Sequence, residues 1–87
     1  MIIIVMYWLP VQHPVVNTLN VEMNIEKAAV CTFNVYSISG QLMSSQQLNV
    51  NNGESLIRIN TNALAQGTYI LRIENNVNQT LQKLFVK

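Results

Sequence analysis

Few side chains in this 87-residue sequence could carry out acid-base or nucleophilic chemistry: it has one histidine, four glutamates and no aspartate. A serine-histidine triad needs a carboxylate that orients the histidine, so a glutamate would have to replace the aspartate. The four candidates alternate with apolar residues or stand beside turns: Glu22, Glu26, Glu54 and Glu74. His13 precedes a proline in a loop-like segment. The sequence therefore predicts no catalytic residues, and we expect the protein not to be an enzyme.

Residues that could bind a metal or a cofactor are equally scarce. The single cysteine and single histidine cannot complete a four-ligand zinc shell. Cys31 lies inside an apolar run, which favours a small buried hydrophobe over a reactive thiol, and a lone cysteine forms no intrachain disulfide. Gly40, Gly53 and Gly67 stand far apart in separate turns and form no phosphate-binding loop. We expect no cofactor and no metal.

Charge is sparse and nearly balanced. Five basic residues against four glutamates give a net charge of +1, and the charged fraction is 10%, well below the usual quarter or so. The basic residues are scattered, whereas nucleic-acid binding needs them gathered on one face. Asn, Gln, Ser and Thr carry the polarity instead, which favours strands and turns. The composition argues against a nucleic-acid partner.

Short runs of alternating apolar and polar residues recur about every ten residues, the pattern of an all-β domain. The predicted strands span residues 19–25, 28–38, 41–50, 55–59, 69–74 and about 80–86. A change of parity between Val35 and Tyr36 predicts a bulge or a strand end there. The third run is weakly patterned and is interpreted as an edge strand, and Asn52-Gly53 predicts a type I′ hairpin turn after it. In the next run, Ile57 and Ile59 should point inward.

Strands of this number need two packed sheets, because one sheet would leave a wide apolar face in water. The segment that holds Leu64, Gly67 and Tyr69 is similar to the corner of immunoglobulin-like sandwiches, in which a tyrosine hydroxyl bonds to the backbone upstream. The alternative is a loop leucine and a core tyrosine that are unrelated. We predict an antiparallel immunoglobulin-like β-sandwich of about seven strands.

An apolar run from Ile2 to Leu9 precedes this pattern and is closed by Pro10. It is shorter than the roughly 20 residues that span a bilayer. It also lacks the basic region and cleavage site of a secretory signal. We therefore expect no transmembrane segment. Residues 1–10 are interpreted as an extra strand or as former linker, ahead of a domain at residues 11–87.

With these residues placed, the chain resembles the type A family of C-terminal sorting domains of type IX secretion system cargo, from about Val11 to Lys87. The usual Tyr-Pro-Asn-Pro opening is here Val11-Gln12-His13-Pro14, so Pro14 remains, followed by matching Leu19 and Val21. Residues 35–42 resemble a family strand and turn with its glycine, Gly40. Residues 64–73 resemble its Leu, Gly-x-Tyr and strand, and residues 82–87 its lysine-flanked apolar terminus.

The resemblance implies a non-enzymatic sorting and anchoring module on a Gram-negative bacterium, with the protein secreted or at the cell surface. Its partners would be an outer-membrane translocon and a cell-surface sortase-like peptidase that commonly removes the domain. The matching positions are the implied recognition residues: Pro14, Gly40, Leu64, Gly67, Tyr69, Lys83 and Lys87.

A physical rationale for such recognition is that a terminal strand with free backbone groups can pair with the sheet edge of a receptor, while Lys83 and Lys87 offer charge. The alternative for these two lysines is a solvated strand end that discourages aggregation. Cargo of this family normally carries a covalent upstream passenger and a signal peptide. Neither is visible here, so we expect a fragment of a larger cargo or the product of a truncated gene. The competing hypothesis is a stand-alone structural or adhesive sandwich that binds a protein or carbohydrate by its loops.

Overall fold

The computed structural model describes residues 2–7, 18–76 and 80–87, and within these ranges the regular structure is strand, with no helix. The strands are β1 (Ile2–Tyr7), β2 (Thr18–Ile25), β3 (Ala29–Ser37), β4 (Leu42–Val50), β5 (Gly53–Asn60), β6 (Thr68–Asn75) and β7 (Thr80–Val86). Alternation is cleanest in β2, β3 and β6, where every second side chain is buried. The predicted all-β class is confirmed.

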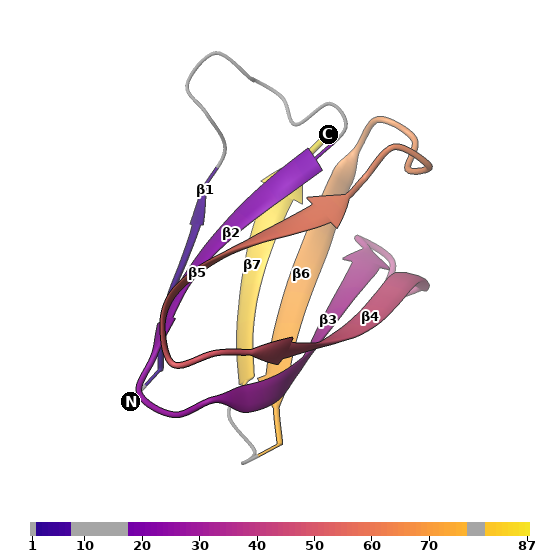
Figure 1. The fold of residues 1–87 in the computed structure, drawn as a ribbon. Helices are drawn as coiled ribbons and strands as arrows, with labels where there is room; N and C mark the ends of the chain where they lie inside the picture. Colours follow the sequence, from indigo (N-terminus) through magenta and orange to yellow (C-terminus); the bar gives the residue numbers. More distant parts are fainter. Residues whose placement is uncertain (1, 8–17, 77–79) are drawn as a thin grey trace.

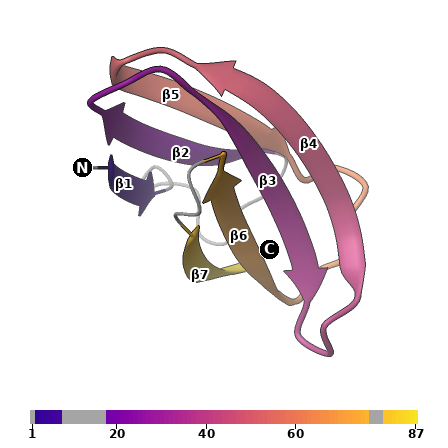
Figure 2. The ribbon, with the colours of Figure 1, turned by 90° about the horizontal axis from the view of Figure 1, so that it is seen from below.

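Antiparallel pairing joins the strands into two sheets, one in the order β1-β2-β5 and one in the order β4-β3-β6-β7. Figures 1 and 2 show the two sheets in views that differ by a quarter turn. Each sheet turns one apolar face toward the other, which is how two half-polar sheets remove their apolar surface from water. The predicted two-layer, antiparallel arrangement is confirmed.

The core is a single cluster between the sheets, and both sheets contribute to it. Its buried members are Leu19, Val21, Met23, Ile25, Cys31, Phe33, Val35, Val50, Ile59, Tyr69, Leu71, Ile73 and Phe85. Ile57 is partly buried against this cluster, so the prediction that Ile57 and Ile59 point inward is confirmed. Cys31 is fully buried, as a small hydrophobe would be.

Two local predictions for the second sheet are also confirmed. The register of β3 against β4 shifts between Val35 and Tyr36, at the change of parity. β4 is an edge strand, and most of its side chains are exposed because Ser44 and its polar neighbours replace core residues. The turn between these strands contains Gly40, whose φ of 94° favours glycine.

The prediction of a hairpin at Asn52-Gly53 is wrong. Gly53 has the positive φ, 88°, that such a turn needs. However, β4 pairs with β3 and β5 pairs with β2, so the segment crosses from one sheet to the other. Packing explains the crossover, because Ile59 lies beside Leu19 of β2, where both side chains are buried. The mostly polar β4 offers no comparable apolar face.

The apolar run at the start of the sequence contributes β1, which pairs antiparallel with β2 along its whole length, from Ile2 opposite Ile25 to Tyr7 opposite Asn20. β1 is thereby an edge strand of the first sheet. At the other end of the sequence, β7 is an edge strand of the second sheet and pairs with β6. Both ends of the sequence thus form outer strands.

Candidate functional site

Four of the residues singled out from the sequence meet in one corner, where the loop between β5 and β6 lies against the end of β7. Local hydrogen bonds hold the loop of this corner in its turns. The Asn60 side-chain oxygen accepts a hydrogen bond of 2.8 Å from the Asn62 backbone amide. The Leu64 backbone amide donates one of 3.0 Å to the Thr61 carbonyl. Asparagine favours such local bonds. Leu64 packs its side chain against the core.

Tyr69 closes the corner from inside. Its hydroxyl donates a hydrogen bond of 2.6 Å to the Ala65 carbonyl four residues upstream. Its ring stacks on Phe85 of β7, with 5.7 Å between centroids and 26° between planes. The predicted bond from the tyrosine hydroxyl to the upstream backbone is confirmed. Because the ring also contacts Phe85, one side chain connects the loop, β6 and β7.

Lys87 closes the corner from outside. Its ammonium group donates to three loop carbonyls, those of Thr61 at 2.6 Å, Leu64 at 2.6 Å and Asn62 at 3.2 Å. Its backbone continues the β6–β7 ladder, since Lys87 and Gly67 exchange both backbone bonds, at 2.8 and 3.1 Å. An ammonium group has three donors, so the loop accepts all that Lys87 can offer. We call residues 61–69 together with Phe85 and Lys87 the C-terminal corner.

The other predicted site residues lie apart from this corner. Lys83 is an exposed residue in the middle of β7, opposite Leu71 of β6. Gly40 is in the turn between β3 and β4, where its amide donates to the Ser37 carbonyl at 2.9 Å. Pro14 lies outside the described residues. The structure therefore brings together Leu64, Gly67, Tyr69 and Lys87 and leaves the rest separate.

Two residues of the corner escaped the sequence reasoning. Thr61 is fully buried and presents its carbonyl to Lys87, and Phe85 is the stacking partner of Tyr69. The alternation of β7 places Phe85 on the core side, so its burial could have been read from the sequence. Nothing local marks Thr61, because its role depends on a lysine 26 residues later in the chain.

The edge of β7 that faces away from β6 has no strand beside it among the described residues. The prediction that the last strand of the sequence lies at a sheet edge is confirmed. Antiparallel edges expose unpaired backbone donors and acceptors, which another strand can use. This edge and the C-terminal corner form the candidate site.

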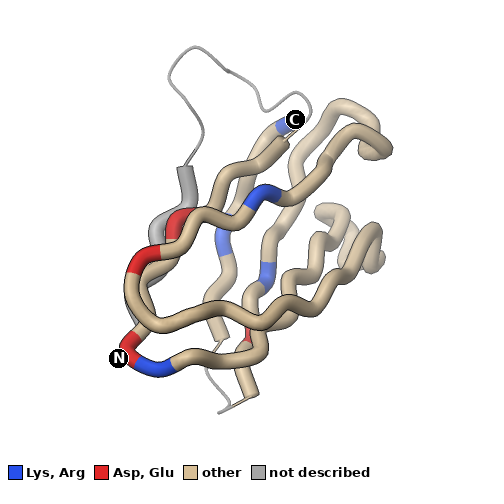
Figure 3. Tube along the Cα trace, in the orientation of Figure 1, with Lys and Arg blue, Asp and Glu red and all other residues tan. Residues whose placement is uncertain are grey.

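Charged side chains in the described ranges are spread over the molecule rather than gathered. Figure 3 shows basic residues on β5, β6 and β7 and near the turn between β2 and β3, with acidic residues among them. No group of three or more potential metal-binding His, Cys, Asp or Glu side chains occurs in these ranges. Burial raises the pKa of the Cys31 thiol above its ordinary value of 9.0, because a thiolate would lack solvation in the core.

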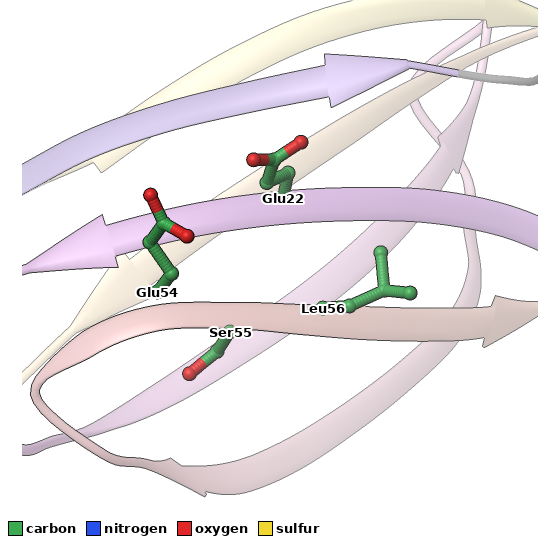
Figure 4. A pocket seen from close by; sticks show the side chains of 4 residues that line it. All are labelled: Glu22, Glu54, Ser55 and Leu56. Carbon is green, nitrogen blue, oxygen red and sulfur yellow. The ribbon is translucent and has the colours of Figure 1, made fainter.

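A shallow depression on the outer face of the first sheet is lined by Glu22, Glu54, Ser55 and Leu56. Figure 4 shows the two carboxylates on the same side of the sheet, while the Ser55 side chain points away from them. Alternation along β5 accounts for this, because neighbouring side chains take opposite faces. The depression does not bring a nucleophile and a base together.

Comparison with known families decides what this arrangement belongs to. Residues 13–87 match the family model of the secretion system C-terminal sorting domain. The matched residues include the C-terminal corner and all strands except β1. The chain belongs to this family. It is therefore a type IX secretion sorting domain, whose family is defined by a sorting signal and not by catalysis.

The sorting domain matches no curated protein and no solved structure. Membership of the family implies interaction with the type IX secretion machinery and export to the surface or the medium. Within the described ranges, no helix has the length and apolar character needed to cross a membrane.

Proposed function

We propose that this domain is the sorting and anchoring module of a larger cargo protein, and that the outer-membrane translocon of a Gram-negative bacterium reads the C-terminal corner together with the free edge of β7. A cell-surface sortase-like peptidase then removes or transfers the domain. The position of β7 at the sheet edge carries the proposal, because backbone groups there are available to a receptor. The family match over residues 13–87 supports it.

The corner explains why such a signal would be read as a folded object. Lys87 binds loop residues 23 to 26 positions earlier, so these contacts exist only in the folded domain. Leu64, Gly67 and Tyr69 act in recognition through the shape of the corner. Lys83 acts directly, because its side chain is exposed on the strand that a receptor would contact.

We further propose that the sandwich is immunoglobulin-like. Two observations support this finer assignment: the strand order β1-β2-β5 over β4-β3-β6-β7, and the tyrosine at the start of β6 that bonds to the loop before it. In immunoglobulin-like sandwiches a tyrosine occupies the same place, near the start of the strand that follows the corner.

For the domain boundary, we propose a sorting domain at residues 11–87 with residues 1–10 as an apolar extension that adds β1 to the first sheet. The family match begins at residue 13, and β1 lies before it. Export of reporter fusions carrying residues 1–87 and 11–87 measures whether β1 takes part in sorting. Equal export places the signal within residues 11–87, and loss in the shorter fusion moves the boundary to include β1.

The experiment for sorting itself is a secreted reporter fused upstream of residues 1–87, produced with a signal peptide in a host with a type IX system. We expect the reporter outside the outer membrane, and in the periplasm once residues 84–87 are deleted. A fusion carrying Leu56→Ala, which changes an exposed side chain on β5 in the other sheet, controls for nonspecific effects. A reporter that stays in the periplasm with the intact domain contradicts the proposal and leaves an adhesive or structural sandwich as the remaining hypothesis.

A further inference from the structure

The backbone of β7 divides into groups that bond to β6 and groups that point away from it. Lys87 exchanges both of its backbone bonds with Gly67. In an antiparallel ladder such bonded pairs recur at every second residue. Phe85, Lys83 and Leu81 therefore also direct their backbone groups to β6. The amides and carbonyls of the residues between them, Gln82, Leu84 and Val86, face the free edge.

Two of the three residues whose backbone faces the free edge, Leu84 and Val86, have exposed apolar side chains. Leu84 is 61% exposed and Val86 is 49% exposed, both on the outer face of the sheet. Leu84 lies opposite Ile70, Ile70 opposite Tyr36, and Tyr36 opposite Leu42, which is itself 52% exposed. These four side chains form an apolar row across all four strands that ends at the free edge. A strand added there would extend the row.

Lys83 gives the other face of the same edge a positive charge. It has the parity of Phe85, which is buried, and lies opposite Leu71, yet its own side chain is exposed because no strand follows β7 in the described sheet. A residue of an added strand opposite Lys83 would form the closely spaced, non-bonded kind of pair, in which side chains approach most nearly. An acidic side chain fits that position.

We propose that the free edge of β7 binds an extended strand of the secretion machinery in antiparallel register, with an acidic residue opposite Lys83 and apolar residues opposite Gln82 and Leu84. The inference rests on the proposed sorting function for the source of this strand. A second copy of the domain is the weaker occupant, because β7 has no acidic residue that could face Lys83. Charge complementarity at Lys83 thus favours a partner of different sequence.

A designed β-hairpin peptide tests the chemistry directly. Its outer strand reads Thr-Val-Glu-Val-Thr, and a matched peptide carries Lys in place of Glu. Titration into the full chain, followed by NMR, should shift the amide signals of Gln82, Leu84 and Val86. We expect the Glu peptide to bind roughly two- to fivefold more tightly than the Lys peptide, the range of one cross-strand charge pair. Lys83→Glu should reverse this preference.

Two further variants make the result specific. Lys27→Glu makes the same charge change at an exposed site between β2 and β3 and should leave the preference unchanged. Leu84→Pro removes an amide hydrogen that faces the free edge but none that bonds to β6, so the domain should fold while peptide binding is lost. Retained folding is read from the amide spectrum of the core strands.

The inference is overturned if neither peptide shifts the edge amides at millimolar concentration, if both bind equally, or if the shifts fall on β4. Edge amides whose signals change with protein concentration alone would identify a second copy as the occupant and would also overturn it.

Export separates this inference from the sorting function. If Lys83→Glu exports normally while deletion of residues 84–87 blocks export, sorting stands and the edge inference fails. If peptide selectivity holds but the intact domain exports no reporter, the edge binds such strands while the proposed source is wrong.

Discussion

At the scale of single residues, the Tyr69 side chain connects the loop, β6 and β7 in the C-terminal corner. Tyr69→Phe keeps the ring stacked on Phe85 but leaves the Ala65 carbonyl without its donor. We expect the free energy of unfolding to fall by about 1 to 2 kcal/mol, the usual effect of leaving a partly buried acceptor unpaired. Urea denaturation measures it.

Tyr36→Phe is the matched control for this prediction. The Tyr36 hydroxyl accepts a long bond of 3.5 Å from Asn34, so its removal should change stability by less than about 0.5 kcal/mol. Equal effects of the two variants would contradict the role given to the Tyr69 hydroxyl.

Lys87 makes a second prediction at this scale. Lys87→Met retains an unbranched apolar chain but removes the ammonium group that binds three loop carbonyls. Because hydrogen bonds to charged groups are stronger than neutral ones, we expect a loss of about 1.5 to 3 kcal/mol. The amides of residues 61–67 should also exchange their hydrogens faster. Lys83→Met, on the exposed part of β7, should stay within about 0.5 kcal/mol of the original protein.

The contrast between these two lysines shows what the sequence could predict of the site. Both lysines were expected to present charge at the strand end. The Lys83 side chain is exposed, whereas the Lys87 side chain is bound within the C-terminal corner. Lys87 binds carbonyls that lie 23 to 26 residues away and that the tyrosine corner assembles. No spacing rule predicts such a contact, since it depends on how the loop folds.

At the scale of elements, β7 has one buried core residue, Phe85, and its other side chains are mostly exposed. Phe85→Ala should lower the free energy of unfolding by about 3 to 5 kcal/mol, because it leaves a cavity beside Tyr69. Leu84→Ala should change it by about 0.5 kcal/mol or less, since Leu84 is mostly exposed. Thermal or urea unfolding of the two variants measures the difference.

The Phe85→Ala variant also shows whether export requires a folded domain. A domain with Phe85→Ala loses export if recognition needs the folded sandwich. Export that persists in a demonstrably unfolded Phe85→Ala variant would mean that the machinery reads a linear sequence, against the proposed reading of a folded corner.

Element by element, the sequence predicted strands best where alternation is regular, as in β2 and β6, and it located the bulge at Val35 and Tyr36 from parity alone. It failed at Asn52-Gly53, because a positive φ defines the bend of the chain but not the sheet that the next strand joins. Packing determines which sheet β5 joins, because Ile59 is buried beside Leu19, a residue distant in sequence.

At the scale of the whole molecule, the core cluster contains a fully buried free thiol, that of Cys31. Its pKa lies above 9.0 because of burial. Between 9.0 and the raised pKa, the unfolded chain loses the thiol proton while the folded chain keeps it. The free energy of unfolding therefore falls as pH rises through this window, and below it the contribution is fully present.

Cys31→Ala tests this sign. The original protein should lose stability more steeply than the variant above pH 9, by up to about 1.4 kcal/mol for each pH unit in the window. Urea unfolding at a series of pH values measures both slopes, and the difference between them isolates the contribution of Cys31. Parallel slopes would contradict the effect of burial on Cys31.

The Lys87 contacts also have a mechanical consequence. A receptor that pulls Lys87 away from the sandwich loads the three bonds from its ammonium group to the loop carbonyls at the same time. The backbone hydrogen bonds between β6 and β7 would then break one after another. Resistance is thus greatest at the first step. An intact domain would withstand gentle tugging at its end, and its strand would peel away only after an abrupt release.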